Sequence, residues 1–240
     1  MNPAIAEVWV YLSATPLLGL TVTLVVYQGA FWIYRQANFH PLLNPVALSV
    51  AALVGILMLT GTPYQEYFDG AQFVHFLLGP ATVALAIPLY SQFDKLKAAL
   101  LPILGALLVG AIVALVSVVG IAWLLGASDT TLISISPKSV TAPIAMGIVE
   151  KMGGLPSLTA VLVVSTGILG AALAKYVLDF LRITDHSVRG FSVGVTAHGI
   201  GTARAFQVSE EAGAFSGLAM GLHGLAAAVL FPLMLWLIGR

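Results

Sequence analysis

The chain has 240 residues, of which 59% are hydrophobic and 8% are charged, and ten Lys and Arg residues balance ten Asp and Glu residues. Because a soluble domain carries roughly 25% charged residues, this composition predicts an integral membrane protein. The balanced charge leaves no basic surface for nucleic acid, and the absence of cysteine excludes disulfides, thiolate catalysis and cysteine-based metal sites. The N-terminus lacks a basic segment, so we expect no cleaved signal peptide.

Hydrophobic segments follow one another along the chain, and a helix needs roughly 20 apolar residues to cross a bilayer. Five segments are uninterrupted: residues 8–33, 43–61, 98–126, 157–181 and 214–238. Three have apolar ends and a middle rich in Gly, Pro, Ser and Thr: residues 72–90, 131–149 and 191–207. The sequence predicts an all-α polytopic membrane protein with about seven to eight hydrophobic segments, in which some helices are discontinuous.

Two of the interrupted segments match at a fixed offset. Their equivalent positions are Pro80, Thr82, Val83 and Ile87 in the first and Pro137, Ser139, Val140 and Ile144 in the second. The match predicts an internal repeat within a single membrane domain, residues 1–240. Its parts are two N-terminal spans (8–61), repeat units at 72–126 and 131–181, and a Gly-rich broken segment with a final span (191–238). Duplicated interrupted helices are typical of the midplane binding site of a transporter.

The connecting segments predict an orientation, because cytoplasmic loops are enriched in Lys and Arg. With the N-terminus outside and residues 131–149 returning to their own side, the following cations are cytoplasmic: Arg35, Lys95, Lys97, Lys175, Arg182, Arg189 and Arg240. Lys151 is then outside, together with these carboxylates: Glu66, Asp69, Asp129, Glu210 and Glu211. This arrangement places Lys95 and Glu211 on opposite sides of the membrane.

Two cations, Lys138 and Arg204, lie in the middle of interrupted segments. An ionisable group at bilayer depth costs roughly 2.5 to 3.5 kcal/mol on insertion scales, and no Asp or Glu lies comparably deep in the sequence. We therefore expect an anion to neutralise these side chains, and a transported carboxylate is the simplest candidate. The alternatives are that Lys138 reaches the interface along its own stem and that Arg204 pairs with Glu210 or Glu211.

The prolines of the matching segments predict half-helices. A helix that starts after Pro80 or Pro137 leaves its first N–H groups unpaired and its positive dipole end at the break, which favours an anion. Thr82 and Ser139 stand two residues further on, at equivalent positions. Their hydroxyls are expected either to cap the half-helices or to contact the substrate.

His198 lies in the sequence GVTAHGIGTAR, next to glycines that allow the backbone to unwind or to approach a ligand. Because the ordinary pKa of histidine is close to neutral, His198 is the candidate for coupling transport to protons. A histidine that is hydrogen-bonded within the core is the alternative. Thr202 is expected to contact the oxygen beside the substrate carboxylate. Glycines at four-residue spacing predict only close helix packing: Gly190, Gly194, Gly213, Gly217 and Gly221.

Several ordered stretches over residues 40–225 resemble the LrgB/CidB family. They are LLNPVALSV (42–50), FLLGPATVALAIPLYSQ (76–92), SPKSVTAPIAM (136–146), LPSLTAV (155–161), AHGIGTARA (197–205) and EEAGAFSGLAMGL (210–222). The resemblance implies two functions, since bacterial members are named holin-like or antiholin-like modulators of murein hydrolase export, while a plastid relative transports glycolate and glycerate and some bacterial pairs are linked to pyruvate uptake. It also implies a small membrane partner of the LrgA/CidA type and a location in the bacterial cytoplasmic (inner) membrane.

The cationic interior favours a carrier of small 2-hydroxy or 2-oxo monocarboxylates. A homodimer is the expected assembly. The alternative is a holin-like pore or antiholin-like regulator, for which an amphipathic lining face is expected rather than broken helices with deep cations. An intramembrane enzyme is not expected: Ser136 with Lys138 and Ser216 with His223 each lack a third, orienting group. No cofactor and no metal site are expected.

Overall fold

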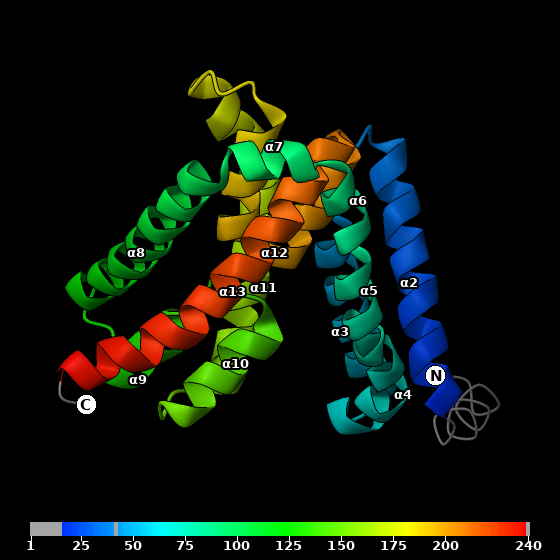
Figure 1. Ribbon diagram of the computed structural model, residues 1–240. Coiled ribbons are helices and arrows are strands. Elements are labelled where there is room, and N and C mark those ends of the chain that lie inside the picture. Colours follow the sequence, from blue (N-terminus) through cyan, green and yellow to red (C-terminus); the bar gives the residue numbers. More distant parts are fainter. Residues whose placement is uncertain (1–15, 41–42, 239–240) are drawn as a thin grey trace. The chain divides into compact units, whose positions relative to one another are not determined.

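The computed structural model describes residues 16–40 and 43–238. Within them every regular element is a helix, which confirms the all-α prediction (Figure 1). Residues 8–15 of the first expected span and Arg240 lie outside the described residues. Five helical stretches are long and apolar enough to cross a membrane: Leu17–Gln36, Tyr64–Ser91, Leu100–Leu124, Pro156–Phe180 and Glu210–Phe231. The expected count of seven to eight is not confirmed, because one apolar helix is short and two segments are built from half-helices.

The chain divides into two compact units, residues 1–84 and 85–240. The helices of the first unit are α2 (Pro16–Gln36), α3 (Pro45–Thr60), α4 (Tyr64–Phe76) and α5 (Leu78–Ala84). Both α3 and α4 pack against α2. The Asn44 side chain caps α3 by accepting hydrogen bonds from the N–H groups of Val46 and Ala47, and Gly61 ends the helix with a φ of 68°. The hydroxyl groups of Thr23 in α2 and Tyr67 in α4 lie 2.7 Å apart.

Pro80 does not open a wide break. It stands in the first turn of α5, where the missing proline N–H is not needed, and the N–H of Ala81 still donates to the carbonyl of Leu77 over 3.0 Å. Only Leu77 separates α4 from α5. The expectation that half-helices start directly after Pro80 and Pro137 is therefore wrong: Pro80 lies within the first turn of α5, and after Pro137 the next half-helix begins only with α10 (Ala142–Lys151). The side chain of Thr82 lies outside the described part of the structure.

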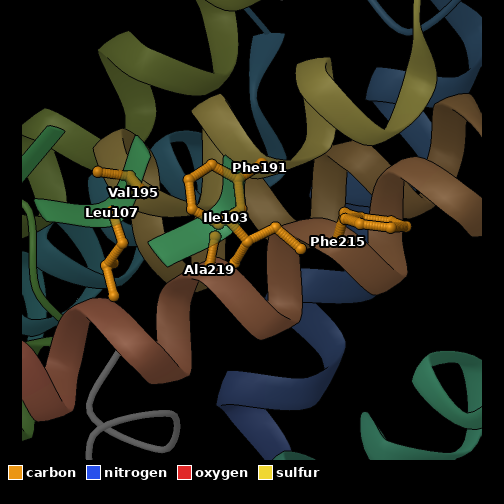
Figure 2. Close-up of a cluster of buried hydrophobic side chains, with 6 residues drawn as sticks. All are labelled: Ile103, Leu107, Phe191, Val195, Phe215 and Ala219. Atoms are coloured by element: carbon orange, nitrogen blue, oxygen red, sulfur yellow. The ribbon is translucent and has the colours of Figure 1, made fainter. Parts of the chain in front are cut away.

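The second unit contains α6 (Ala86–Ser91), α7 (Phe93–Ala98), α8 (Leu100–Leu124), α9 (Asp129–Ile135), α10 (Ala142–Lys151), α11 (Pro156–Phe180), α12 (His186–Val208) and α13 (Glu210–Ile238). Helix α13 packs against α6, α8, α10 and α12. One buried cluster joins three helices, and Figure 2 shows its six side chains: Ile103 and Leu107 from α8, Phe191 and Val195 from α12, and Phe215 and Ala219 from α13. This cluster holds the first half of α12 in place, and that half carries two of the residues of the candidate site.

Helix α12 folds back on itself at His198, where φ is 41° and ψ is −133°. In the first half, Gly190 lies against Ala212 and Gly194 against Ser216, so this half runs parallel to α13. In the second half, Thr202 meets Ser216 and Phe206 meets Gly213, so the direction is reversed. The segment predicted as a broken helix is thus a hairpin of two half-helices, and residues 186–197 span roughly 18 Å, about half of a bilayer core.

Close helix contacts at the predicted glycines are only partly present. A Cβ atom added at Gly190, Gly194 or Gly213 would collide with a neighbouring residue, which confirms packing at those positions. At Gly217 the nearest atom, of Leu85, would lie 3.4 Å away, and at Gly221 there is nothing within 4 Å. The contacts at Gly190, Gly194 and Gly213 therefore allow α12 to pack closely against the first part of α13.

A second hairpin is formed by α9 and α10, which are separated by residues 136–141. Pro137 cannot continue α9, and Pro143 in the first turn of α10 starts the next half-helix. The hairpin is fastened to the start of α11 by Ser134, whose hydroxyl accepts from the N–H of Leu155 (2.9 Å) and whose carbonyl accepts from the hydroxyl of Thr159 (2.9 Å). The break predicted for residues 131–149 is therefore present.

The two hairpins approach the middle of α11 from its opposite ends. The α9–α10 hairpin is held at the N-terminal end of α11 through Ser134, whereas α12 begins at the C-terminal end, where Arg189 contacts Asp179 over 2.7 Å. Figure 1 shows α9 and α10 at the lower end of this unit and the connection from α11 to α12 at its upper end. Each hairpin tip therefore reaches the interior.

The predicted orientation is wrong in one respect. Lys95 in α7 forms an ion pair with Glu211 at the start of α13, and the hydroxyl of Ser91 donates to Glu210 over 3.4 Å. These residues lie at the same end of the unit and cannot face opposite sides of a membrane. The reason is that α7 is a short helix beside the α12–α13 connection, which counting charges along the chain does not reveal.

Candidate functional site

Lys138 stands at the tip of the α9–α10 hairpin and lines two neighbouring pockets. One, of about 400 Å³, extends to Gly110 and Ser117 of α8. The other, of about 480 Å³, extends to Thr166 and Gly170 of α11. Lys138, Ser192 and Thr196 line both pockets, so the two spaces meet around the ammonium group. Among the described residues that line them, none is acidic.

The ammonium group of Lys138 keeps part of its hydrogen-bonding capacity. It is half-buried and, among the described residues, donates one hydrogen bond, to the hydroxyl of Ser139 over 3.2 Å. Because an ammonium group has three N–H donors, two remain for a ligand. A carboxylate that accepted them would form charge-assisted hydrogen bonds, which are roughly twice as strong as neutral ones. The arrangement can therefore bind a small carboxylic acid anion.

Two residues with hydroxyl groups, Ser192 and Thr196, line the same pockets as Lys138. On the first half of α12, the Ser192 hydroxyl donates to the carbonyl of Val188 (2.9 Å) and the Thr196 hydroxyl donates to that of Ser192 (2.8 Å). Both oxygens retain lone pairs that can accept a hydrogen bond from a hydroxyl group of a ligand. Neither residue was among the predicted site residues. Their four-residue spacing on one helix face was the available signal, but only the folding of α12 brings them to Lys138.

Pro137 and Ser139 accompany Lys138 as the sequence suggests. Pro137 is fully buried, and its carbonyl accepts from the N–H of Val140 (3.0 Å), which closes the turn. Ser139 is buried and accepts from Lys138. The expectation that the Ser139 hydroxyl caps the following half-helix is not met, because α10 begins after Thr141 and that cap position makes no side-chain hydrogen bond. Ser139 lines the pocket of about 400 Å³, and its contact with a substrate stays a prediction.

His198 and Thr202 are both engaged within the protein. The Nε2 atom of His198 donates to the carbonyl of Val163 over 2.9 Å, which is the geometry of a histidine bonded in the core. The Thr202 hydroxyl donates to the carbonyl of His198 (2.8 Å) and lies 2.9 Å from the hydroxyl of Ser216. All three side chains are buried. In this conformation they hold the tip of α12, and their predicted contacts with protons or substrate stay predictions.

Arg204 lies apart from Lys138. It lines a different pocket, of about 160 Å³, together with Lys175 and Arg189. Its guanidinium group donates to Gln207 over 2.9 Å, whereas Glu211 pairs with Lys95. Arg204 and Lys138 therefore line different pockets, because the second half of α12 turns back toward the end from which the first half came.

Two predicted site residues remain, Pro80 and Thr82, and the structure adds a buried polar side chain, His223. Pro80 and Thr82 belong to the first unit, so their roles stay predictions. His223 of α13 is buried, and within the described part of the chain its Nδ1 atom has no hydrogen-bond partner. The sequence does not indicate this burial, because His223 is an isolated histidine in an apolar segment. Its neighbours in a pocket of about 220 Å³ are apolar residues of α8 and α13.

A family model described as the LrgB-like family matches residues 23–237 of the chain. Among curated proteins, "Uncharacterized protein YwbG" of Bacillus subtilis is 36% identical over 219 residues, which cover 91% of this chain and 97% of that protein. "Antiholin-like protein LrgB" of Bacillus mycoides is 32% identical, covering 95% and 99% of the two chains. "Holin-like protein CidB" of Staphylococcus epidermidis is 30% identical, covering 95% and 98%. No solved structure matches the chain.

Proposed function

Since the chain belongs to the LrgB-like family of multi-pass membrane proteins, we propose that it is an inner-membrane carrier of small monocarboxylate anions. In this proposal Lys138 binds the carboxylate group. The observation that carries it is the position of Lys138, a cation between two half-helix hairpins, in pockets that contain hydroxyl groups and whose described lining has no acidic residue.

The depth of Lys138 supports an anionic ligand. Because the two hairpins reach α11 from opposite ends, our proposal puts their tips near the middle of the membrane, where the hydrophobic core is least hydrated. A cation held there is costly unless it is paired. Lys138 has no ion-pair partner among the described residues. A carboxylate that enters would pair with it, and the attraction is strong because little water screens it.

The pockets match a small solute in size and chemistry. Spaces of about 400 and 480 Å³ lie within the range of roughly 300–1,000 Å³ typical of ligand pockets. Ser192 and Thr196 offer hydroxyl groups close to Lys138, where they would contact an oxygen on the carbon next to the carboxylate. These contacts favour 2-hydroxy and 2-oxo acids such as glycolate, glycerate and pyruvate over simple fatty acids.

The opposed hairpins supply a route for alternating access. Each tip is held by a small number of hydrogen bonds: Ser134 with Leu155 and Thr159 for one, His198 with Val163 for the other. In our proposal, withdrawal of one tip at a time exposes Lys138 to one side of the membrane. Interrupted helices at a midplane site are typical of secondary transporters.

The second candidate function is a holin-like or antiholin-like modulator of murein hydrolase export, acting with a small LrgA/CidA-type membrane partner. The names of the relatives in Staphylococcus epidermidis and Bacillus mycoides favour it. The two functions are separable by solute size, because a pore releases large dyes and a carrier does not. A homodimer is part of either proposal.

We also propose that the chain is not an enzyme. The two hydroxyls that stand near a base in the sequence are engaged elsewhere: Ser136 donates to the carbonyl of Ile133 (2.8 Å), and Ser216 lies 2.9 Å from Thr202. Among the described residues neither hydroxyl forms a hydrogen bond with a base, as an activated nucleophile requires.

Uptake into liposomes tests the carrier. Purified protein is reconstituted, and the entry of labelled glycolate, glycerate and pyruvate is measured with Lys138→Gln, Lys138→Arg and the control Lys151→Gln. We expect saturable uptake that Lys138→Gln abolishes, that Lys138→Arg partly retains and that Lys151→Gln leaves unchanged. Release of a trapped large dye by the wild type, or equal uptake by Lys138→Gln, would contradict the proposal.

A further inference from the structure

A basic pocket lies between α11 and α12, away from Lys138. Lys175 of α11 and Arg189 and Arg204 of α12 line it, and the rest of its lining is apolar. Its volume is about 160 Å³. Lys175 and Arg189 lie near the C-terminal end of α11 and the start of α12, so the pocket stands at the end of the unit that also carries α7.

Of the three cations in this pocket, the described part of the chain neutralises Arg189 and leaves Lys175 and Arg204 unpaired. From residue 156 to residue 238 the sequence has four acidic residues. Each has a partner other than Lys175 and Arg204: Asp179 pairs with Arg189 of the pocket (2.7 Å), Glu211 with Lys95, Glu210 accepts from Ser91, and Asp185 accepts from the N–H groups of Ser187 and Val188. Lys175 and Arg204 therefore have no carboxylate partner among the described residues. Gln207 holds the guanidinium group of Arg204 without reducing its charge.

The basic pocket adjoins the larger pocket that reaches Lys138. Both are lined by Ala174, Leu178 and Val193. The two pockets therefore lie next to each other along α11 and the first half of α12, and the pair is called the groove. From Lys175 to Thr166 the groove follows nine residues of α11, roughly 13 Å. One end of the groove is marked by the three basic side chains and the other by Lys138.

We propose that this basic pocket is an entry site, which takes up the same small carboxylate that Lys138 binds. The inference rests on the proposed function and adds the route by which the anion reaches Lys138. A mouth lined by one sign of charge with apolar walls concentrates ions of the opposite sign and raises their rate of binding. Because cations gather at this end of the unit, the entry site faces the cytoplasm.

Transport kinetics test the route. Arg204→Gln and Lys175→Gln are expected to raise the KM for the transported acid about three- to tenfold while leaving the maximal rate nearly unchanged, and to weaken the dependence of KM on ionic strength. Arg182→Gln is the matched control, since Arg182 is an exposed cation at the same end that does not line the pocket. A KM and salt dependence equal to those of the wild type in both pocket variants would overturn the proposal.

Chemical labelling tests the site without any flux. Pyridoxal 5′-phosphate forms an imine with a lysine amine, borohydride reduces the imine, and peptide mass spectrometry locates the product. In nanodiscs of phosphatidylcholine alone, we expect Lys175 to react several-fold faster than the exposed Lys151, Arg204→Gln to remove this preference, and glycolate, glycerate or pyruvate to protect Lys175 at constant ionic strength.

The outcomes separate the two proposals. Equal labelling of Lys175 and Lys151 overturns the entry site, whatever the transport assay shows. Protection by added phosphatidylglycerol but by none of the three acids also overturns it, because the pocket would then hold a lipid phosphate. Protection by an acid in a protein that fails to transport leaves the anion site standing and removes the carrier.

Discussion

His198 at the fold of α12 donates a hydrogen bond from Nε2 to the main-chain carbonyl of Val163 in the middle of α11, over 2.9 Å. This bond joins the tip of one half-helix hairpin to the long helix that the other hairpin also contacts. The same residue adopts a φ of 41° and a ψ of −133°, a conformation that glycine tolerates and other residues rarely adopt. His198 therefore combines backbone strain with a side-chain contact that holds the strained turn in place.

The first prediction separates these two effects. His198→Ala removes the hydrogen bond and keeps the strain, and the lost bond should lower the free energy of unfolding by roughly 0.5–1.5 kcal/mol, because the Val163 carbonyl keeps its helical hydrogen bond. His198→Gly removes the hydrogen bond and relieves the strain, so it should be more stable than His198→Ala. Thermal unfolding in detergent measures both. A glycine variant no more stable than the alanine variant would show that the turn is not strained.

The second prediction concerns Gly167 of α11, beside the same imidazole. A Cβ atom at Gly167 would lie 2.7 Å from Cε1 of His198 and 2.9 Å from Cδ1 of Ile200. Gly167→Ala should therefore displace the tip of α12 and reduce both stability and uptake. Gly105→Ala in α8 is the control, because nothing lies within 4 Å of its added methyl group and alanine favours a helix. Equal behaviour of the two variants would be evidence against a close contact at Gly167.

The third prediction is a pH dependence at the start of α12. Hydrogen bonds from the hydroxyl of Ser187 and the N–H of Val188 lower the pKa of the Asp185 carboxyl group below its ordinary value. Its pKa in the folded protein is thus below that in the unfolded chain. The stabilisation is present above about pH 4 and is lost as the pH falls through the folded pKa.

The variant Asp185→Asn keeps a capping oxygen but cannot titrate. At pH 6 we expect the wild type to melt slightly higher than Asp185→Asn, with a small difference because Asp185 is exposed to solvent. Between pH 4 and pH 3 the difference should shrink. Melting temperatures of the two proteins measured in detergent across this range provide the check, and a constant difference would mean that the cap does not depend on charge.

The fourth prediction concerns membrane orientation. Lys95 and Glu211 form an ion pair, so α7 and the start of α13 lie at the same face. The chain contains no cysteine, which makes single-cysteine labelling clean. Cysteines at positions 97 and 210 should both react with a membrane-impermeant maleimide from the cytoplasmic side, and a cysteine at position 151 from the other side. Labelling of positions 97 and 210 from opposite sides would contradict the ion pair.

The sequence predicts the helical class and one of the two hairpins well. Pro137 and Pro143 flank a polar stretch, and because a proline interrupts helical hydrogen bonding, the break between α9 and α10 follows directly. Pro80 does not produce the same break, because proline is also tolerated in the first turn of a helix, where its ring causes no clash. The residues next to a proline do not by themselves decide whether it breaks a helix or stands in the first turn of one.

The geometry of the site depends on contacts that sequence spacing does not encode. The glycines beside His198 signal a flexible backbone, but not that the chain reverses direction there. Ser192 and Thr196 precede that reversal and line the pockets of Lys138, whereas the reversal carries Arg204 into another pocket. The sequence places Lys138 and Arg204 in interrupted segments alike, and the structure places them in two neighbouring pockets.

Solute counterflow tests the central claim most directly. Liposomes that hold the protein are loaded with unlabelled glycolate, diluted into a trace of labelled glycolate and followed over time. A carrier that binds the anion at Lys138 and exposes it to one side at a time should give a transient accumulation of label above equilibrium, and Lys138→Gln should give none. An absence of accumulation in the wild type with glycolate, glycerate and pyruvate alike, or an undiminished accumulation in Lys138→Gln, would contradict the account.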